Sequence, residues 1–209
     1  MRTAELIDRL AQSNAPARGA TPTLARAVAV GALVSAALML SFLGIRPDYA
    51  EAVKTWSYWL KFAYPLALAL VALRTAARLA RPGTRANAGW ELLPPAIVIA
   101  AALAQWTATP AAARLPLLMG HSSALCPWRI LTLSLPLLIA TFWAMRRLAP
   151  TKPALAGTFA GLFAGSMAAW IYSFACDETS AVFLAVWYTA GIALAALLGA
   201  VAGRWALRW

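Results

Sequence analysis

The side chains best suited to chemistry in this sequence are two cysteines, Cys126 and Cys176, the only cysteines in the chain. Pro127 follows Cys126 and is a residue type favoured in the first turn of a helix, where the thiolate form of a cysteine is stabilised. Three interpretations are open: two unrelated small apolar residues, a structural disulfide, or a switchable pair that forms a disulfide or binds a metal. We favour the switchable pair, because the spans predicted below place both cysteines on one face of a membrane.

Three further residues near the cysteines offer ligand atoms for a metal. His121, the only histidine, precedes Cys126 by five residues, and Asp177 and Glu178 directly follow Cys176. Thiolate, imidazole and carboxylate ligands together suit a zinc-type ion, although a lone histidine in a loop is more often a solvated polar residue. We therefore expect no resident cofactor, and a transient metal ion as the one alternative, bound at Cys126 and Cys176.

The sequence lacks the usual motifs of catalytic sites. It has no glycine-rich phosphate loop, no nucleophile elbow and no paired zinc-binding histidines. It also lacks the C-x-x-C pair that a quinone-linked thiol oxidoreductase normally uses. We expect the protein not to be an enzyme.

The elements that position these residues are long apolar segments. The chain of 209 residues is 62% hydrophobic and 12% charged, whereas soluble domains are about 45–50% apolar and about 25% charged. Runs of about 20 apolar residues match the thickness of a bilayer, and in lipid such runs must be helical. The six runs lie at 24–45, 56–73, 92–109, 128–145, 155–175 and 181–201. The sequence predicts an all-α, polytopic membrane protein with a bundle of six transmembrane helices.

Positive charge orients these spans. Thirteen of the 18 Lys and Arg residues fall in the N-terminal tail, in the second and fourth connections and at the C-terminus, and five fall on the opposite face. Because cytoplasmic segments carry the excess of Lys and Arg, we expect both termini on the cytoplasmic side of a bacterial inner membrane. The net charge of +11 then indicates orientation, and no direct contact with nucleic acid. Both cysteines face the oxidising outer compartment.

The tail, 1–22, is expected to be cytoplasmic, and 23–209 forms the transmembrane domain. Residues 3–11 predict a short amphipathic helix with Glu5 in its first turn. Leu6, Ile7 and Leu10 form one apolar stripe, which either lies on the membrane or docks into a groove on a protein partner. The tail is too short for a soluble catalytic domain, so any cytoplasmic output must come from short elements that bind something else.

Small residues recur at every fourth position on the last two spans. They are Gly157, Gly161 and Gly165 on the fifth span, and Gly191, Ala195, Gly199 and Gly203 on the sixth. Such rows let two helix backbones approach closely. The connection between the two spans is short, so we expect them to pack against each other within one chain. Whether the protein also forms a homo-oligomer stays open.

An ordered set of residues in the second half of the chain carries a resemblance to a known family. The set comprises Cys126-Pro127-Trp128, Leu133-Ser134-x-Pro136, Arg146-Arg147-Leu148-Ala149-Pro150-Thr151-x-Pro153-x-x-Ala156-Gly157, Ala160-Gly161-Leu162-x-Ala164-Gly165, Tyr172, Cys176-x-Glu178, Phe183, Trp187-Tyr188, Gly191 and Leu207-Arg208-Trp209. In the tail, Glu5-Leu6-Ile7-x-x-Leu10 also fits. The chain resembles the NrsF-type integral-membrane anti-sigma factors, six-span proteins of proteobacterial inner membranes.

The resemblance implies a function that the residues alone do not give. It implies that the N-terminal segment holds an extracytoplasmic-function sigma factor inactive at the membrane. It also implies that Cys126 and Cys176 report stress such as oxidants or heavy metals. The alternative is a membrane thiol-disulfide oxidoreductase or a small transporter. A proton-coupled carrier usually has acids or histidines deep in its bundle, and the middle of these spans has neither.

Overall fold

Helices make up the protein in the computed structural model, which describes residues 3, 5, 20–81, 88–148 and 150–208. The elements are α2 (Ala20–Phe42), α3 (Tyr49–Ala52), α4 (Trp56–Leu79), the 3₁₀ helix η1 (Ala88–Leu92), α5 (Leu93–Ala108), α6 (Ala111–Met119), α7 (Cys126–Met145), the 3₁₀ helix η2 (Arg146–Leu148), α8 (Pro153–Tyr172), α9 (Ala181–Phe183), the π-helix η3 (Leu184–Tyr188) and α10 (Thr189–Ala206). Those ranges contain no strand, which confirms the prediction of an all-α fold.

Six of the helical segments are long and apolar enough to cross a membrane. Their bounds agree with the predicted spans to within a few residues, except that the second and the last continue to Leu79 and Ala206. The extra turns carry arginines, Arg74 and Arg78 on α4 and Arg204 on α10. An arginine ends the apolar run from which the span is predicted. The helix itself can continue past that arginine, because the arginine lies beyond the hydrocarbon core.

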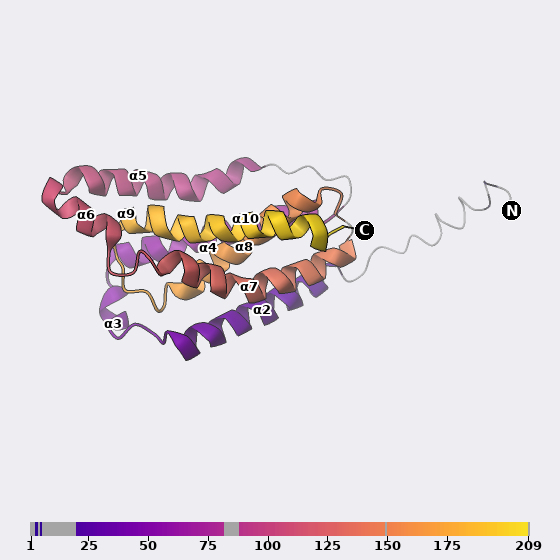
Figure 1. Ribbon diagram of the computed structural model, residues 1–209, viewed down its shortest axis with the longest axis horizontal. Helices are drawn as coiled ribbons and strands as arrows, with labels where there is room; N and C mark the ends of the chain where they lie inside the picture. Colours follow the sequence, from indigo (N-terminus) through magenta and orange to yellow (C-terminus); the bar gives the residue numbers. More distant parts are fainter. Residues whose placement is uncertain (1–2, 4, 6–19, 82–87, 149, 209) are drawn as a thin grey trace.

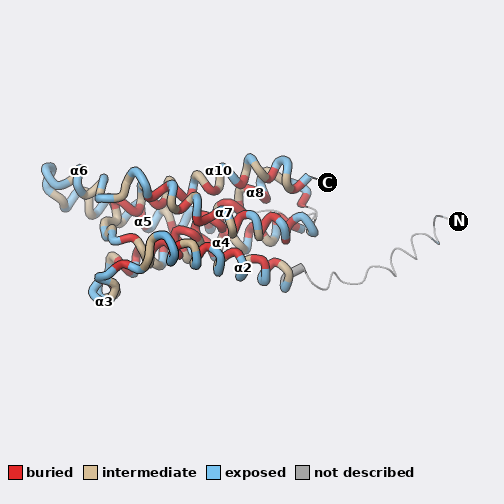
Figure 2. Tube along the Cα trace, turned by 60° about the horizontal axis from the view of Figure 1, so that its bottom comes forward, coloured by how far each residue is buried: buried red, intermediate tan, exposed pale blue. Residues whose placement is uncertain are grey.

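The helix α8 lies at the centre of the bundle. It packs against α10, α4 and α7, while α2 covers α7 on one side and α5 packs against α9 and α4 on the other (Figure 1). Of the six candidate spans, α8 has the largest buried share. Figure 2 shows the buried residues along the facing sides of the helices and the exposed residues on the outside, as expected for a bundle whose outer surface meets lipid.

Small residues allow α8 and α10 to touch backbone to backbone. A Cβ added at Gly157 would collide with the Gly199 carbonyl oxygen, and one at Gly161 would collide with the carbonyl oxygen of Ala195. Gly165 faces the same stretch of α10. The expected packing within one chain is therefore present. Gly191 differs from the prediction, because it faces Pro127 and Ile130 of α7 and not α8.

Three short elements were not predicted. α3 lies between the first two spans, and α6 follows α5 directly although Pro116 lies inside it. The π-helix η3 follows α9 within the last span, and the indole Nε1 of its Trp187 donates to the Leu118 carbonyl on α6 at 2.9 Å. A π-turn has no distinctive residue pattern, so the spacing of apolar residues does not reveal it.

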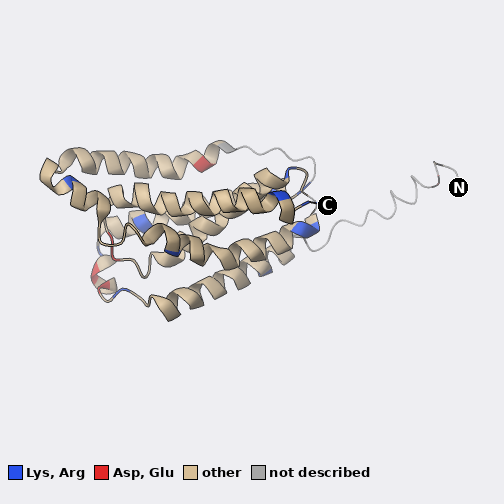
Figure 3. Ribbon diagram, viewed as in Figure 1, with Lys and Arg blue, Asp and Glu red and all other residues tan. Residues whose placement is uncertain are grey.

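The charged residues lie mainly at the two ends of the bundle (Figure 3). α2 begins at the same end as α10 finishes, and this end also holds η2. We call it the terminal end, and we call the opposite end, which holds Cys126 and Cys176, the cysteine end. Of the predicted tail helix, Thr3 and Glu5 are helical, whereas Leu6, Ile7 and Leu10 lie outside the described residues.

Candidate functional site

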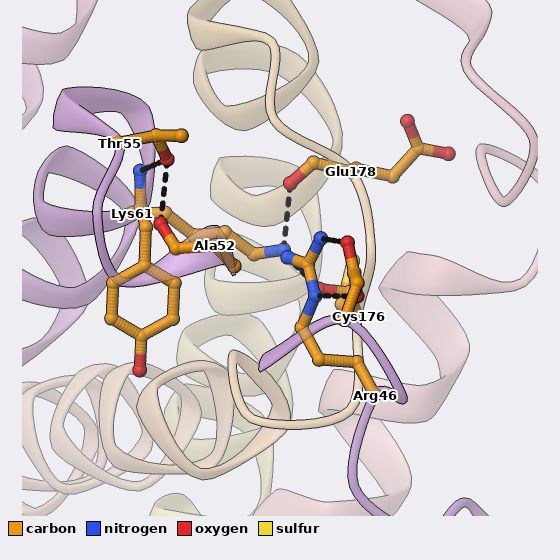
Figure 4. A network of polar contacts seen from close by, with 8 residues as sticks. Arg46, Ala52, Thr55, Lys61, Cys176 and Glu178 are labelled. Carbon is orange, nitrogen blue, oxygen red and sulfur yellow. Dashed lines mark hydrogen bonds and ion pairs between the residues drawn. The ribbon is translucent and has the colours of Figure 1, made fainter. Parts of the chain in front are cut away.

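Three connections meet at the cysteine end: 43–55 between α2 and α4, 109–125 between α5 and α7, and 173–180 between α8 and α9. Thr55 caps α4 by accepting from the Tyr58 amide, and Ser180 caps α9 by accepting from the Phe183 amide. The helix ends are therefore fixed locally. What joins the three connections is a polar network around Cys176 (Figure 4).

Two cations converge on the backbone carbonyl of Cys176. Lys61 Nζ, from α4, donates to it at 2.7 Å, and Arg46 Nη1 donates to it at 3.2 Å. Lys61 also donates to the Glu178 carbonyl at 2.8 Å. The loop that carries Cys176 is thus tied to α4 and to the connection after α2 by hydrogen bonds from charged groups, which are stronger than neutral ones.

Arg46 is itself held in place by Asp48. Its Nε and Nη2 donate to the two carboxylate oxygens at 2.7 and 2.6 Å, and its backbone N–H donates to the Phe174 carbonyl at 3.0 Å. These hydrogen bonds raise the pKa of Arg46 and hold the pKa of Asp48 below its ordinary value. The pair therefore stays charged at neutral pH and fixes the guanidinium against Cys176.

Both thiols are enclosed. Cys126, the first residue of α7, is 0% exposed, and Cys176 is 3% exposed. Both are free thiols, and both belong to one cluster of buried side chains. Cys176 is among the groups that act electrostatically on Cys126. The predicted effect of the helix N-terminus on Cys126 is opposed by this burial, because thiols in apolar surroundings are inert. Both cysteines lie at the same end of the bundle, inside the core and not on its surface.

The aromatic neighbours of the pair complete this core. Tyr172, on α8, and Tyr188, at the end of η3, have ring centroids 5.9 Å apart, and both side chains are almost fully buried. Arg129 Nη1 donates to the Tyr172 hydroxyl at 3.2 Å. The surroundings of the pair are close-packed, so a change in the volume or charge at either sulfur must displace neighbouring side chains.

His121 and Glu178 do come together, but not as metal ligands. Glu178 Oε1 accepts from the backbone N–H of His121 at 2.6 Å, from that of Ser122 at 3.0 Å and from the Ser122 hydroxyl at 3.2 Å. Gly120 has a φ of 52°, and an added Cβ there would meet the Glu178 carboxylate. This carboxylate therefore fixes the turn before α7.

The metal site predicted from five residues is not assembled in this conformation. Asp177 and His121 are exposed, while the two thiols are buried. Across the described ranges, no group of three or more His, Cys, Asp and Glu side chains gathers in a way that could hold a metal ion. His121, Asp177 and Glu178 are thus not ligands around the pair here, because the turn uses the carboxylate of Glu178 for backbone N–H groups.

Sequence reasoning missed the role of Lys61 and Arg46. A lysine near the outer end of a membrane span normally extends its amine to the water, but Lys61 is 3% exposed and bonds to backbone carbonyls. One signal was present: Lys61 lies within an apolar run and has no acidic residue three or four positions away in the sequence. A lysine in that position needs partners from elsewhere in the fold.

The terminal end is basic. Arg146, Arg147 and Arg208 line a cleft of 390 Å³ together with Trp143, and the Arg147 guanidinium lies 4.3 Å from the Trp143 ring centre. The connection that contains Arg146 joins α7 to α8, the two helices that carry the cysteines at their other ends. The helical hairpin α7–α8 thus links the thiol pair directly to this cleft.

Comparison with known proteins confirms the resemblance noted in the sequence. A model of the NrsF family, described as negative regulator of sigma F, matches residues 10–209. The anti-sigma-F factor NrsF of Caulobacter vibrioides is 38% identical over 216 residues, and the probable anti-sigma-F factor NrsF of Azospira oryzae is 35% identical over 213 residues. Both alignments cover 100% of each chain. No solved structure matches significantly. The chain therefore belongs to the NrsF family of negative regulators of sigma F.

Proposed function

We propose that this protein is a transmembrane anti-sigma factor that holds an extracytoplasmic-function sigma factor at the inner membrane and releases it when Cys126 and Cys176 react. The observation that carries this proposal is the enclosure of two cysteines, 50 positions apart in the sequence, in one core at the end opposite the start of α2 and the finish of α10. A buried cysteine pair is suited to sensing, because sensing needs no open path for a substrate to the sulfurs. Repeated turnover does need such a path, so the pair is unsuited to it.

The orientation of the chain rests on its charges. The cysteine end carries Asp48, Glu51, Asp177 and Glu178, whereas arginines predominate at the terminal end. The positive-inside rule then places the terminal end in the cytoplasm, where a sigma factor is found. The thiols lie toward the oxidising compartment, where disulfides form and persist.

The chemistry at the pair is either oxidation or metal binding. In oxidation, an oxidant accepts two electrons, both thiols lose their protons and one S–S bond forms. In metal binding, a soft heavy-metal ion replaces the two protons. Either event changes the separation of two sulfurs in a filled core, which typically costs about 1–3 kcal/mol in strained packing if nothing moves.

The hairpin α7–α8 is the element that would transmit this change. Cys126 begins α7, Cys176 follows α8 by four residues, and the connection 146–152 closes the hairpin at the cytoplasmic end. A displacement of the helix ends at the pair therefore reaches the arginine cleft without passing through another element. Coupling of about 1–3 kcal/mol between two such sites is typical of switches.

The tail supplies the second contact with the sigma factor in this proposal. Replacement of Leu6 and Leu10 by Asp charges the apolar stripe, and we expect the double variant to lose co-purification with the partner sigma factor. Gln12→Asp, directly after the predicted helix and outside its apolar stripe, adds a negative charge to the tail as the control and should still bind. Undiminished binding by the double variant would remove the tail from the interface.

The sensor half is tested in cells with a reporter under the partner sigma factor. Cys126→Ser should abolish induction by oxidant or by a soft heavy metal, while repression without inducer persists. An unchanged response would exclude the cysteines from the mechanism. The alternatives of a thiol-disulfide oxidoreductase or a small transporter gain no support from the family comparison.

A further inference from the structure

A cavity of about 290 Å³ lies beside the cysteine site, between α4, α5 and the connection from α8 to η3. Neither cysteine lines it. Half of its lining residues are apolar, and its polar side chains are those of Ser57, Lys61, Gln105, Glu178 and Tyr188, together with two hydroxyl residues of the loop. The cavity itself has no part in the mechanism proposed above, although Lys61 and Glu178 on its wall also belong to the network around Cys176.

Lys61 brings a buried positive charge to this cavity. Its ammonium bonds to two backbone carbonyls, lies 5.4 Å from the centre of the Tyr188 ring, and has no carboxylate partner in the part of the chain that the structure describes. Glu178 lines the cavity, but its carboxylate points away from Lys61 (Figure 4) and is occupied by the turn before α7. A buried charge without a counter-charge is costly, so an anion in the cavity would be stabilised.

Two further donors are available to a ligand. The Tyr188 hydroxyl is buried and makes no hydrogen bond with any described residue. Gln105 uses its amide oxygen to accept from the Ala181 and Val182 backbone N–H groups, at 2.8 and 3.4 Å. In that orientation the amide nitrogen of Gln105 donates no hydrogen bond to any residue that the structure describes. The available polar groups are thus donors, which is the complement that an anion requires.

We propose that this cavity binds a small amphipathic monocarboxylate, with its carboxylate at Lys61 and Gln105 and its apolar body against Trp56, Leu60 and Ala104. The apolar walls select this class over an inorganic ion, which would leave them without contacts. Because the same ammonium holds the Cys176 carbonyl, an occupied cavity and the position of the Cys176 loop influence each other. The binding itself does not depend on the anti-sigma function.

Calorimetry on the full chain in lipid nanodiscs tests the site, with benzoate as the probe, benzyl alcohol as its neutral counterpart and sulfate as a purely polar anion. We expect benzoate to bind, and the other two to bind at least about tenfold more weakly. If benzyl alcohol bound equally well, apolar contacts alone would account for binding. If sulfate bound equally well, the positive charge alone would account for it. Either result, or no benzoate binding up to about 10 mM, overturns the proposal.

Variants locate the binding. Lys61→Met should weaken benzoate at least about tenfold, whereas Lys54→Met, which removes an exposed lysine paired with Glu51 at the same end, should leave it unchanged. If Lys61→Met does not fold, Ala104→Trp fills the mouth of the cavity, leaves Lys61 in place and should block binding. Full benzoate affinity in Ala104→Trp would contradict the location.

Discussion

The carbonyl of Cys176 receives the hydrogen bonds of two cations that lie far away in the sequence, Arg46 and Lys61, at separations of 130 and 115 positions. No spacing rule connects a side chain to a backbone carbonyl at such separations, so these roles could not be predicted. That the two cysteines lie at the same end could be predicted, because topology alone places the start of one span and the end of the next on one face. Their burial could not, since it depends on how side chains of other helices pack around them.

Glu178 provides a test of the turn before α7. Its carboxylate accepts three hydrogen bonds from His121 and Ser122, so Glu178→Ala should lower the free energy of unfolding by about 1–3 kcal/mol. The neighbouring Asp177 is exposed, and Asp177→Ala should stay within about 0.5 kcal/mol. Thermal unfolding in detergent measures both. Equal effects of the two substitutions would contradict the assigned role of Glu178.

The Arg46–Asp48 pair predicts a pH dependence with a defined sign. The hydrogen bond from Arg46 lowers the pKa of Asp48 from its ordinary 3.8, so the stabilisation is present above that pH and is lost as the pH falls through the lower, folded value. Wild type should have a higher Tm than Asp48→Asn at pH 6. The difference should shrink once the pH is below 3.8, and a difference that grew on acidification would refute the assignment.

At the scale of elements, the apolar runs predicted all six spans, because length and lipid physics leave few alternatives. They missed α3, α6 and the π-helix η3. Pro116 marks a break in a sequence pattern, yet α6 tolerates it within a short helix. The contact of α8 with α10 was predicted from its glycines, whereas the contact of Gly191 with α7 required knowledge of how the last span is rotated.

The α8–α10 contact yields a prediction at this scale. Gly157→Ala places a methyl group against the Gly199 carbonyl, and overpacking of this kind typically costs about 1–3 kcal/mol. Gly89→Ala is the matched control, because nothing lies within 4 Å of a Cβ at that position. The Tm of purified protein should fall for Gly157→Ala alone. A parallel loss in Gly89→Ala would mean that the close approach is not the cause.

At the scale of the whole molecule, helices join an end that holds acidic residues and two enclosed thiols to an arginine-rich end, where α2 begins and α10 finishes. Family membership identifies the regulatory class, and the hairpin α7–α8 offers the shortest physical route between the ends. The distribution of Lys and Arg along the sequence predicted this difference between the two ends. It also placed both cysteines at one end of this hairpin, but it did not reveal the cleft that Arg146, Arg147 and Arg208 line near the other end.

The most direct test of the account is release of the sigma factor from the purified complex. The full chain with its bound sigma factor is placed in nanodiscs, a thiol oxidant is added, and the fraction of sigma factor that remains bound is measured over time. We predict release from wild type, retention by Cys126→Ser and by Cys176→Ser, and recapture after a dithiol reductant is added. Equal release from wild type and both serine variants would contradict the claim that this cysteine pair controls the regulator.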